Sequence, residues 1–507
     1  MVLSLRRALA SDAETIFKWR NDPSIMAKGF LQRAVSWDEH LAWFNEMVQT
    51  DARIMFIILQ EKIPVGQVRF DRESDAAAEI SIYMAPGHEG QGLGVLGMLR
   101  GCFETFHYWD IDQIVARVRQ DNYEGKRAFI KAEFTVKSES EFSEVVEYFL
   151  ARPQDVPHNR LTFGKEEVLA VSDAVACGQW AEGSSVDEFE KLLADISGRR
   201  TAICVGSGLC AIKFGLLALG VGDGDEVIVP GYSCVALANA VLSLGAIPRP
   251  ADVTPGDSNL DPDHLLSVCS PKTRAIIAVH TFGQPMAIDS IMQLGVPVIE
   301  DCAHVLGGSI DGRPIGSIGS MAITSFYATK LIGSGAGGAV LLDDAQQEVL
   351  VRGICDYVDQ PASRLRANDK MTNIDATLGL AQLRRLEEMV LARRRLAERY
   401  LELLGELQKK AGGYNLPNND GERVWYRFVI ETTSIKAAEI IETMRGYGVK
   451  ADKPVHCWLS PEQLRDCPGA SRAYDNFVSI PLYPTLTQTE QDRVCHAFEI
   501  AVTRMSQ

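Results

Sequence analysis

The sequence lacks the cysteine patterns that mark disulfide frameworks and zinc sites. Its 11 cysteines stand singly, with no CxxC pair and no Cys/His array at zinc-ligand spacing. The odd number and the absence of a secretory leader both argue against paired cysteines. We therefore expect reduced, mostly buried thiols and no metal site.

Long hydrophobic runs are also missing. No apolar stretch approaches the length needed to span a bilayer, and the N-terminal basic pair is followed by Ser11 and Asp12 before any apolar core develops. There is no low-complexity segment and no visible internal repeat. These absences predict a globular, cytoplasmic chain without membrane contact.

Positive charge is scarce, because 51 Lys and Arg residues face 67 Asp and Glu residues and leave a net charge of −16. Affinity for nucleic acid depends on basic side chains that neutralise phosphates, so this balance excludes a generic nucleic-acid binder. A small-molecule substrate fits better. If that substrate carries phosphates, local cationic side chains and backbone N–H groups must hold them.

The length of 507 residues is more than one hydrophobic core usually serves, so we expect two or three domains. Residues 1–150 alternate helical patterns, such as Ser11–Arg20 and Trp37–Gln49, with strand patterns. The runs IMFIILQ and PVGQVRFD predict a hairpin that turns at Glu61 and Lys62. Residues 151–160 contain two prolines and no apolar periodicity, which predicts a linker.

Residues 161–507 follow a different pattern. From Glu167 onward, short apolar strands alternate with helices, which is typical of a parallel sheet covered on both faces. A long charged helix, roughly Ala376–Leu404, is expected to separate this large domain, about 161–400, from a small α+β domain, about 401–507. The fold class is therefore α/β, preceded by an N-terminal α+β domain.

The segments VIEDCAH and GSIGSMAITSFYATKLIGSGAGGAV resemble the core signature of the DegT/DnrJ/EryC-type sugar aminotransferases, and MTNIDATLGLAQL and VHTFGQP extend the resemblance in the family's order. The resemblance implies a fold-type-I enzyme that uses pyridoxal 5′-phosphate and acts on nucleotide-linked keto-sugars, with glutamate as the expected amino donor. It makes Lys330 the Schiff-base lysine, for which the alternative is a solvated surface lysine. A branch of the family that deoxygenates sugars lacks this lysine, so its presence favours transamination.

The resemblance places Asp301 beside the pyridine nitrogen of the cofactor, where a carboxylate keeps that nitrogen protonated. A helix cap is the alternative role for an aspartate here. His304 matches a position near the cofactor ring, although a packed histidine without a catalytic part is also compatible. His280 matches a family position as well, with core packing as the equal alternative.

A strand that runs through a Gly-Ser-Gly turn into a helix is suited to hold the cofactor phosphate, because helix N-termini present free N–H groups. We expect Gly208 and Leu209 to contribute backbone donors, Ser207 to be a weaker ligand and Ser325 to supply a hydroxyl. In the family, an asparagine of the neighbouring subunit completes this site, and Asn368 matches it. The resemblance therefore implies a homodimer.

Two positions depart from the family's pattern. Lysine stands at position 370 where the family has an arginine, so the bidentate geometry of a guanidinium is lost there. Cys234 replaces the aromatic ring that many members stack on the cofactor, and Tyr232 is the alternative stacking residue.

Residues 1–150 resemble the GNAT acyl-CoA-dependent N-acetyltransferases. Their segment AEISIYMAPGHEGQGLGVLGMLRG joins a strand to a helix through a glycine-rich turn, so the N–H groups of Gly90, Gly92 and Gly94 would contact the pyrophosphate of acetyl-CoA. Asn122 matches the family asparagine in the following segment. Glu79 is a candidate base for the incoming ammonium, with a solvent-facing role as the equal alternative.

Two residues oppose acetyl transfer. Glu89 puts a negative charge where the pyrophosphate turn usually opens with Arg or Gln, and Phe129 stands where many members have a proton-donating tyrosine. The opening FKWRNDPSIMAKGF resembles GNATs that acetylate amino groups on nucleotide sugars. Our leading hypothesis is therefore a bifunctional enzyme that aminates and then acetylates such a sugar. A silent CoA-binding or interaction domain, and a PLP-bound regulatory protein, are the alternatives.

Overall fold

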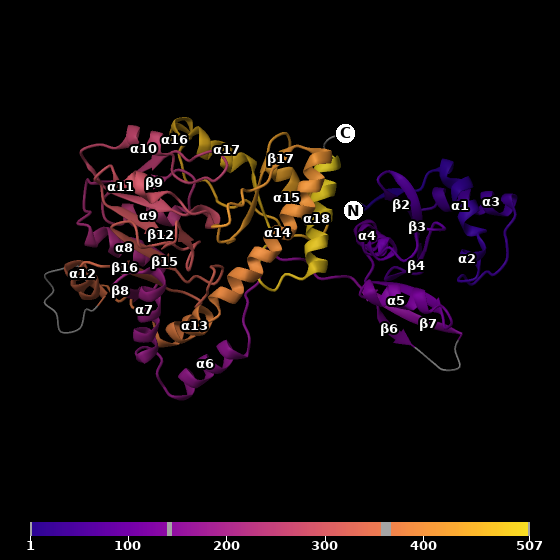
Figure 1. Ribbon diagram of the computed structural model, residues 1–507, viewed down its shortest axis with the longest axis horizontal. Coiled ribbons are helices and arrows are strands. Elements are labelled where there is room, and N and C mark those ends of the chain that lie inside the picture. The colour runs from indigo at the N-terminus through magenta and orange to yellow at the C-terminus, as the bar shows by residue number, and fades with distance from the viewer. Residues whose placement is uncertain (1–2, 139–143, 356–366, 505–507) are drawn as a thin grey trace. The chain divides into compact units, whose positions relative to one another are not determined.

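The structure is a computed structural model, and it describes residues 3–138, 144–355 and 367–504. The chain divides into two compact units, 1–155 with 446–448, and 156–445 with 449–507. Figure 1 shows both units along the colour gradient from the N-terminus to the C-terminus. Each unit has its own sheet and its own hydrophobic core.

The N-terminal unit is built on one mixed sheet, whose described strands run in the order β1-β2-β3-β4-β5-β7-β6. Only the β4–β5 pair is parallel among these strands. The strands are β1 (Leu3–Arg7), β2 (Arg53–Gln60), β3 (Ile63–Arg72), β4 (Ala77–Met84), β5 (Gln113–Arg119), β6 (Thr135–Ser138) and β7 (Val145–Ala151). The helices are η1 (Ala10–Asp12), α1 (Ala13–Arg20), α2 (Pro23–Met26), α3 (Trp37–Gln49), α4 (Leu93–Tyr108) and α5 (Tyr123–Lys131).

The predicted hairpin of this unit is β2–β3, and its two turn residues both have positive φ, 49° at Glu61 and 72° at Lys62. A two-residue turn of this kind matches the right-handed twist of the strands it joins. Helix α4 packs closely on the sheet. A Cβ at Gly97 would come within 2.5 Å of Ile58 Cδ1, so the absence of a side chain there permits the contact.

The large C-terminal unit contains a second sheet in the order β10-β9-β11-β12-β15-β16-β8. The pairs from β10 to β15 are parallel, and β16 lies antiparallel to both of its neighbours. These strands are β8 (Thr201–Val205), β9 (Glu226–Pro230), β10 (Ile247–Ala251), β11 (Thr273–Val279), β12 (Val298–Asp301), β15 (Met321–Ser325) and β16 (Gly338–Leu342), with a separate short pair β13 (Ser309–Ile310) and β14 (Arg313–Pro314). The predicted mostly parallel α/β sheet is confirmed.

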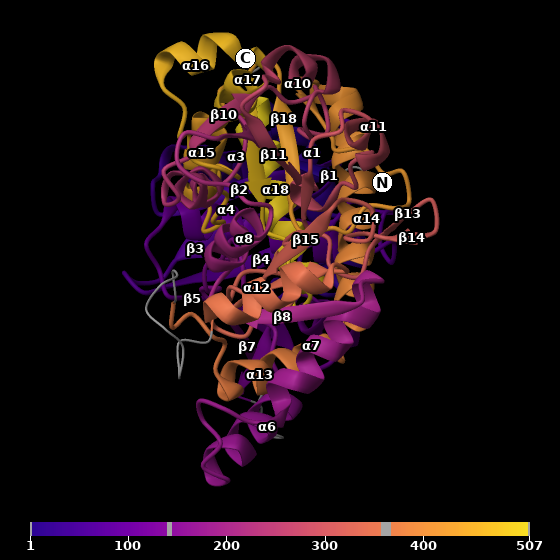
Figure 2. The same cartoon turned by 90° about the vertical axis from the view of Figure 1, so that its left-hand side faces the viewer.

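Both faces of this sheet are buried. In β8, Ile203 and Val205 enter one core cluster, whereas Ala202 and Cys204 enter another on the opposite face. Figures 1 and 2 show helices around this sheet. The helices of this part are α6 (Lys165–Ala176), α7 (Ser184–Ser197), α8 (Gly208–Ala218), α9 (Val235–Leu242), α10 (Pro262–Val268), η2 (Thr281–Gly283), α11 (Ile288–Met292), α12 (Ala345–Cys355) and α13 (Asn373–Leu383). Successive side chains of a strand point to opposite faces of the sheet, so apolar residues at successive positions build a core on each face.

The C-terminal part of the unit is a small antiparallel sheet with helices. Its strands are β17 (Tyr414–Asn415), β18 (Phe428–Thr432) and β19 (Phe477–Ile480), and its helices are α14 (Leu386–Ala411), α15 (Ala437–Gly446), α16 (Pro461–Asp466), α17 (Pro468–Asn476) and α18 (Gln488–Arg504). The predicted single helix over 376–404 is wrong, because the structure has two helices with a break at Arg384 and Arg385. The Arg385 guanidinium donates to buried Glu167, 2.9 Å away, which fastens the break to the N-terminal end of α6.

The segment predicted as a linker makes structural contacts at both ends. Ala151 ends β7, and Arg152 N–H donates to Asp112 O at 2.7 Å. Val156 is fully buried and accepts a hydrogen bond from Lys450 N–H at 2.9 Å. His158 Nε2 lies 2.8 Å from Ser479 Oγ. These contacts fasten residues 156–160 to the small C-terminal sheet. Within the described residues, the helices are all too short or too polar to cross a membrane.

Candidate functional site

The candidate site lies at the carboxyl ends of the strands in the large sheet. Strands β12 and β15 are parallel neighbours, and their ends bring Asp301 and the segment after Ser325 to the same edge. The end of β8 joins this edge as well, because β8 and β15 both run antiparallel to β16. In open α/β sheets, ligands bind at this edge.

Asp301 is buried at the end of β12, and its Oδ1 accepts a hydrogen bond from Ala303 N–H at 3.0 Å. Burial raises the pKa of this carboxyl, although the positive charge of Lys330 partly offsets the effect. A nearby protonated ring nitrogen would favour the charged carboxylate in the same way. The predicted neighbour of the cofactor nitrogen is therefore a desolvated acid facing a cationic lysine.

Lys330 follows β15 in a turn that is closed by a hydrogen bond from its own N–H to Tyr327 O at 2.8 Å. Its Nζ lies 5.2 Å from the ring centroid of Tyr426, which belongs to the segment before β18. The Tyr426 ring is also stacked on His304, with the centroids 4.2 Å apart and the planes 11° apart. An aromatic stack thus borders the lysine amine.

The pKa values of His304 and Tyr426 are both shifted from their usual values. Burial, together with the charges of Lys330 and Arg427, puts the pKa of His304 well below its usual value, so its ring is neutral at pH 7. Its Nδ1 is buried and has no hydrogen-bond partner among the residues that the structure describes. Burial opposes ionisation of Tyr426, but Lys330 and Arg427 outweigh it and lower the pKa of the phenol to about 8.

The predicted phosphate site lies at the first turn of α8. Ser207 is the N-cap of this helix, and its Oγ accepts a hydrogen bond from Cys210 N–H at 3.1 Å. Gly208 opens the helix directly against β15, where a Cβ would meet the Cβ of Ser325 at 2.7 Å. Ser207, Gly208, Leu209 and Ser325 are therefore gathered in one place, where the N–H groups of Gly208 and Leu209, in the first turn of an 11-residue helix, are available to an anion.

These features fit pyridoxal phosphate. The site has an amine for the aldehyde, a buried carboxyl for the ring nitrogen and a helix N-terminus with hydroxyls for the phosphate. The unpartnered His304 Nδ1 is a further polar atom that a bound ring could satisfy. The donor set therefore matches each polar part of that group.

The other predicted residues of this site are placed less centrally. Tyr232 is buried and meets three aromatic rings edge-on, with the nearest, that of Tyr474, at 4.8 Å. Cys234 is exposed at the N-cap of α9. Asn368 is exposed, beside Asp369, whose carbonyl accepts a hydrogen bond from Gly206 N–H at 2.6 Å. Contacts of Tyr232 and Asn368 with the cofactor stay predictions.

A buried ionic network around Glu300, which precedes Asp301 in β12, was not predicted. Glu300 is fully buried, and its carboxylate accepts hydrogen bonds from Gly316, Ile318 and Gly319 N–H at 3.1, 2.8 and 2.6 Å. Nε2 of His280 lies 3.4 Å from Glu300 Oε2. Because His280 Nδ1 accepts from Met286 N–H, its proton is on Nε2, facing the carboxylate.

Replacing Glu300 with Gln is expected to lower the free energy of unfolding at pH 7 by about 3 kcal/mol or more. Burial raises the pKa of Glu300, but hydrogen bonding from His280 and from the backbone outweighs it and lowers the pKa overall. The charged form therefore stabilises the fold above the pKa of unfolded glutamate, about 4.3. That contribution is lost as the pH falls through the lower pKa of the folded state.

Urea unfolding of the wild type and Glu300→Gln at pH 7 and at a pH below about 4 measures this effect. The difference between the two proteins should shrink at the lower pH, because the protonated carboxyl resembles an amide. Glu388→Gln, which alters an exposed ion pair with Arg385, is the control with little effect. An equal difference at both pH values would contradict the role assigned to the charge.

The N-terminal unit contains the predicted glycine turn. Gly90 and Gly92 have φ of 74° and 78°, and a Cβ at either position would meet no atom within 4 Å. Gly92 is the N-cap of the 16-residue helix α4, and Gly94 lies in its first turn. The turn is therefore open in front of the helix N-terminus. Glu89 is folded back, since its Oε2 accepts from Gly87 N–H at 2.8 Å.

The other predicted residues of this unit have structural partners. Asn122 caps α5, with its Oδ1 accepting from Gly125 N–H at 2.9 Å. Glu79 Oε2 lies 3.1 Å from Arg117 Nη1. Phe129 is buried, with its ring centroid 5.1 Å from that of Phe134. The catalytic role of Glu79 stays a prediction.

Sequence reasoning missed Tyr426 and Arg427. They lie almost 100 residues after Lys330 in the chain, and the only local signal is the aromatic and basic run RVWYRF before a strand. Such a run is equally typical of a strand that is not part of a site. Only the tertiary structure reveals that Tyr426, in the segment before β18, lies close to Lys330.

Comparison with known proteins gives two family matches in the same order as the two units. Residues 3–135 match the acetyltransferase (GNAT) domain, and residues 162–499 match the DegT/DnrJ/EryC1/StrS aminotransferase family. The spore coat polysaccharide biosynthesis protein SpsC of Bacillus subtilis (strain 168) is 30% identical over 382 residues, which cover 68% of this chain and 96% of that protein.

GDP-perosamine synthase of Caulobacter vibrioides is 31% identical over 337 residues, or 62% of this chain and 90% of that protein. Among solved structures, DesV of S. venezuelae is 28% identical with a TM-score of 0.63, covering 69% of this chain and 99% of DesV. The aminotransferase from Psychrobacter cryohalolentis is 25% identical with a TM-score of 0.64, covering 69% of this chain and all of its own length, 100%.

Proposed function

Because the chain belongs to the DegT/DnrJ/EryC1/StrS aminotransferase family and also carries a GNAT domain, we propose that it is a bifunctional enzyme of nucleotide-sugar modification. Its large unit transfers an amino group, with glutamate as donor, to a nucleotide-linked keto-deoxysugar. Its N-terminal unit then acetylates the new amine with acetyl-CoA. The observation that carries the proposal is the convergence of Lys330, Asp301 and the N-terminus of α8 at one edge of a parallel sheet.

The large unit is proposed to hold pyridoxal phosphate, which, when bound, supplies an electron sink for the carbon that loses a proton. Asp301 keeps the ring nitrogen protonated by facing it with a buried carboxylate. The first-turn N–H groups of α8, with the hydroxyls of Ser207 and Ser325, bind the phosphate.

Lys330 has two tasks in this proposal. Its Nζ would hold the cofactor covalently, and its free amine would move the proton of the substrate carbon. The aromatic border formed by Tyr426 and His304 restricts where this amine can point. Neutral His304 would offer Nδ1 to the cofactor ring without adding a positive charge beside Lys330.

A homodimer is part of the proposal. Around α6 and the turn that follows it, the exposed side chains include large apolar ones, a composition that favours burial against another protein surface. They are Leu161, Phe163, Val168, Leu169, Val175 and Trp180. Asn368 is exposed and therefore accessible to a second copy of the chain.

The nature of the sugar substrate is supported by relatives. SpsC is described as a polysaccharide biosynthesis protein and the Caulobacter protein as a synthase of a GDP-linked sugar. Amination and acetylation are consecutive on such a sugar, since the product amine of the first reaction is the acceptor of the second. This order is the chemical reason for joining both domains in one chain.

Acetyl-CoA is proposed to bind at Gly90, Gly92 and Gly94, before α4. Asn122 and Glu79 are the further candidate residues of this domain. The alternative is a domain that binds CoA without turnover. It is favoured by Phe129, which cannot donate a proton to the leaving thiolate, and by the ion pair of Glu79 with Arg117.

Replacing Glu89 with Gln is expected to tighten CoA binding by about 3-fold to 10-fold at low salt, because it removes a negative charge from the turn that faces the pyrophosphate. Isothermal titration of CoA into both proteins measures the change. Glu133→Gln, in the same unit but at the far end of α5, is the comparison variant. A CoA affinity that is unchanged or weaker in Glu89→Gln would oppose the proposed pyrophosphate site.

The whole proposal is tested by supplying the protein with pyridoxal phosphate, glutamate, acetyl-CoA and a panel of nucleotide-linked keto-deoxysugars. Mass spectrometry should detect an aminated sugar without acetyl-CoA and an acetamido sugar with it. An aminated product that is never acetylated would support the silent-domain alternative. No aminated product from any member of the panel would oppose the proposed substrate class.

A further inference from the structure

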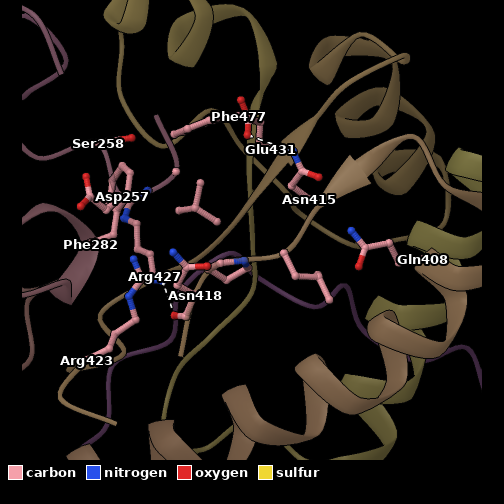
Figure 3. A pocket seen from close by; sticks show the side chains of 14 residues that line it. Asp257, Ser258, Phe282, Gln408, Asn415, Asn418, Arg423, Arg427, Glu431 and Phe477 are labelled. Carbon is pink, nitrogen blue, oxygen red and sulfur yellow. Dashed lines mark hydrogen bonds between the residues drawn. The ribbon is translucent and has the colours of Figure 1, made fainter. Parts of the chain in front are cut away.

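A polar cavity of about 370 Å³ lies within the large unit, next to the candidate site. Figure 3 shows the side chains around it. They come from the loop 256–258, η2, the C-terminal part of α14, β17 and the residues after it, the segment that leads into β18, β18 itself and β19. Phe282 in its lining is also parallel to His304, with ring centroids 6.2 Å apart, so the cavity adjoins the proposed cofactor site.

Arg423 is a buried cation in this lining. Only 4% of it is exposed, and burial lowers the pKa of its guanidinium to about 10. Nη1 donates to Asn418 O at 3.2 Å, whereas Nε has no hydrogen-bond partner among the described residues. Its Cζ lies 5.0 Å from the Trp425 ring centroid, and the charges of Asp420 and Asp257 act on it, but no described carboxylate lies within ion-pair distance. A buried guanidinium without a direct ion pair is costly, which makes this position favourable for a bound anion.

Arg427 connects the cavity with the catalytic lysine. Its Cζ lies 5.4 Å from the centroid of the Tyr426 ring, whose centroid is 5.2 Å from Lys330 Nζ. The guanidinium is half-buried, and Nη1 donates to Pro454 O at 3.3 Å. One arginine thus lies deep in the cavity and the other on the side of Lys330.

The two carboxylates of the lining already have partners. Glu431 is paired with Arg472 at 3.1 Å. Asp257 accepts hydrogen bonds from the Thr254 hydroxyl and from Asn259 N–H, the latter at 2.9 Å. The hydrogen bonds to Asp257 do not cancel its charge, which acts on Arg423, and the two arginines are the cations of the described lining.

The walls of the cavity are held together by hydrogen bonds. Thr281 N–H donates to Asn259 Oδ1 at 2.9 Å, and the Gln284 amide donates to Asp420 Oδ2 at 2.5 Å. Val424 N–H donates to Gly283 O at 2.8 Å. Within this frame, Phe282 has a φ of 52°, an uncommon conformation for an aromatic residue. Such strain persists where the surroundings impose it, and it concentrates at ligand sites.

We infer that Arg423 and Arg427 form an oxyanion site that binds the anionic end of a substrate whose reacting group lies at Lys330. The ligand is a carboxylate or a phosphate group, and guanidinium groups bind both through charge-assisted hydrogen bonds. The inference rests on the proposed transamination. There, donor and acceptor occupy one site in turn, so a carboxylate of the amino donor and a phosphate of the nucleotide sugar are both candidates for this position.

Calorimetric titration of the PLP-loaded protein with two unreactive probes tests this site. Glutarate represents the donor carboxylate, and inorganic pyrophosphate represents the sugar-linked diphosphate. Arg423→Gln and Arg427→Gln should each weaken binding of at least one probe by about tenfold or more. The control is Arg465→Gln, which removes an exposed arginine of α16 and should leave both affinities unchanged.

The probe that loses affinity identifies the source of the anion, and loss for both probes means that the site serves both substrates. If Arg423→Gln fails to fold, as a buried substitution can, half-buried Arg427→Gln still decides the question. Equal affinities in the wild type and in folded variants, or no binding of either probe, would overturn the inference. These titrations require no turnover, so they are separate from a failure of glutamate to react.

Discussion

Replacing Lys330 with alanine is expected to reduce amino transfer from glutamate by about 10³-fold or more, because one side chain both holds the cofactor and moves the proton. Its neighbours cannot take over both tasks. Burial holds the pKa of His304 well below its usual value, which makes its ring a weak base, and the Tyr426 phenol, with a pKa of about 8, cannot form the covalent link that an amine forms with an aldehyde. Single-turnover kinetics with glutamate, followed by the absorbance of the bound cofactor, measure the loss.

Covalent attachment provides a second readout for the same variant. Borohydride reduction followed by peptide mass spectrometry should locate the cofactor on Lys330 in the wild type and find none attached in Lys330→Ala. Lys191→Ala, an exposed lysine of α7, should behave as the wild type in both experiments. Full amino transfer by Lys330→Ala would contradict the assignment of this residue.

Replacing Asp301 with Asn is expected to lower the rate of the glutamate half-reaction by about 10²-fold or more, with little change in the shape of the site. The amide can still accept a hydrogen bond from Ala303 N–H, but it cannot stabilise a positive ring nitrogen. Because Asp301 is buried, no water replaces that missing charge. Stopped-flow absorbance measures the rate, and the Tm reports folding.

Asp195→Asn, on the exposed side of α7, is the matched control for Asp301→Asn. It should alter neither the rate nor the amount of bound cofactor. If Asp301→Asn bound the cofactor normally and reacted at the wild-type rate, Asp301 would only stabilise the turn that follows β12. The hydrogen bond from Ala303 N–H is the structural part of its role and is retained by Asn.

Much of the fold could be predicted because its signals are local. The alternation in β8, with Ile203 facing one core and Cys204 the other, follows from strand periodicity. The β2–β3 hairpin follows from two strand-forming runs separated by Glu61 and Lys62. The edge of the sheet could be predicted as well, since parallel strands end together.

Features that depend on distant residues could not be predicted from the sequence. The break between α13 and α14 depends on the bond between Arg385 and Glu167, two residues far apart in the chain. The docking of Val156 depends on its partner Lys450. In a periodicity pattern, these positions are indistinguishable from a continuous helix and a free linker.

The residues of the candidate site also divide into those that could be predicted from the sequence and those that could not. Lys330 and Asp301 could be singled out because Asp301 ends an apolar strand and Lys330 follows one, each within a recognisable motif. Arg423, Arg427 and Tyr426 could not, because they become part of the site only through packing of the small sheet against the large one. Their charges are significant because of burial, which a single sequence does not reveal.

In the proposed mechanism, Lys330 and Asp301 make this chain a pyridoxal-phosphate aminotransferase. The most direct test is the absorption spectrum of the purified, PLP-loaded protein before and after addition of glutamate, followed by removal of glutamate and addition of 2-oxoglutarate. We predict that glutamate abolishes the visible band of the lysine-bound cofactor and that 2-oxoglutarate restores it. A protein that shows no such band, or a band that neither compound alters, would contradict the account.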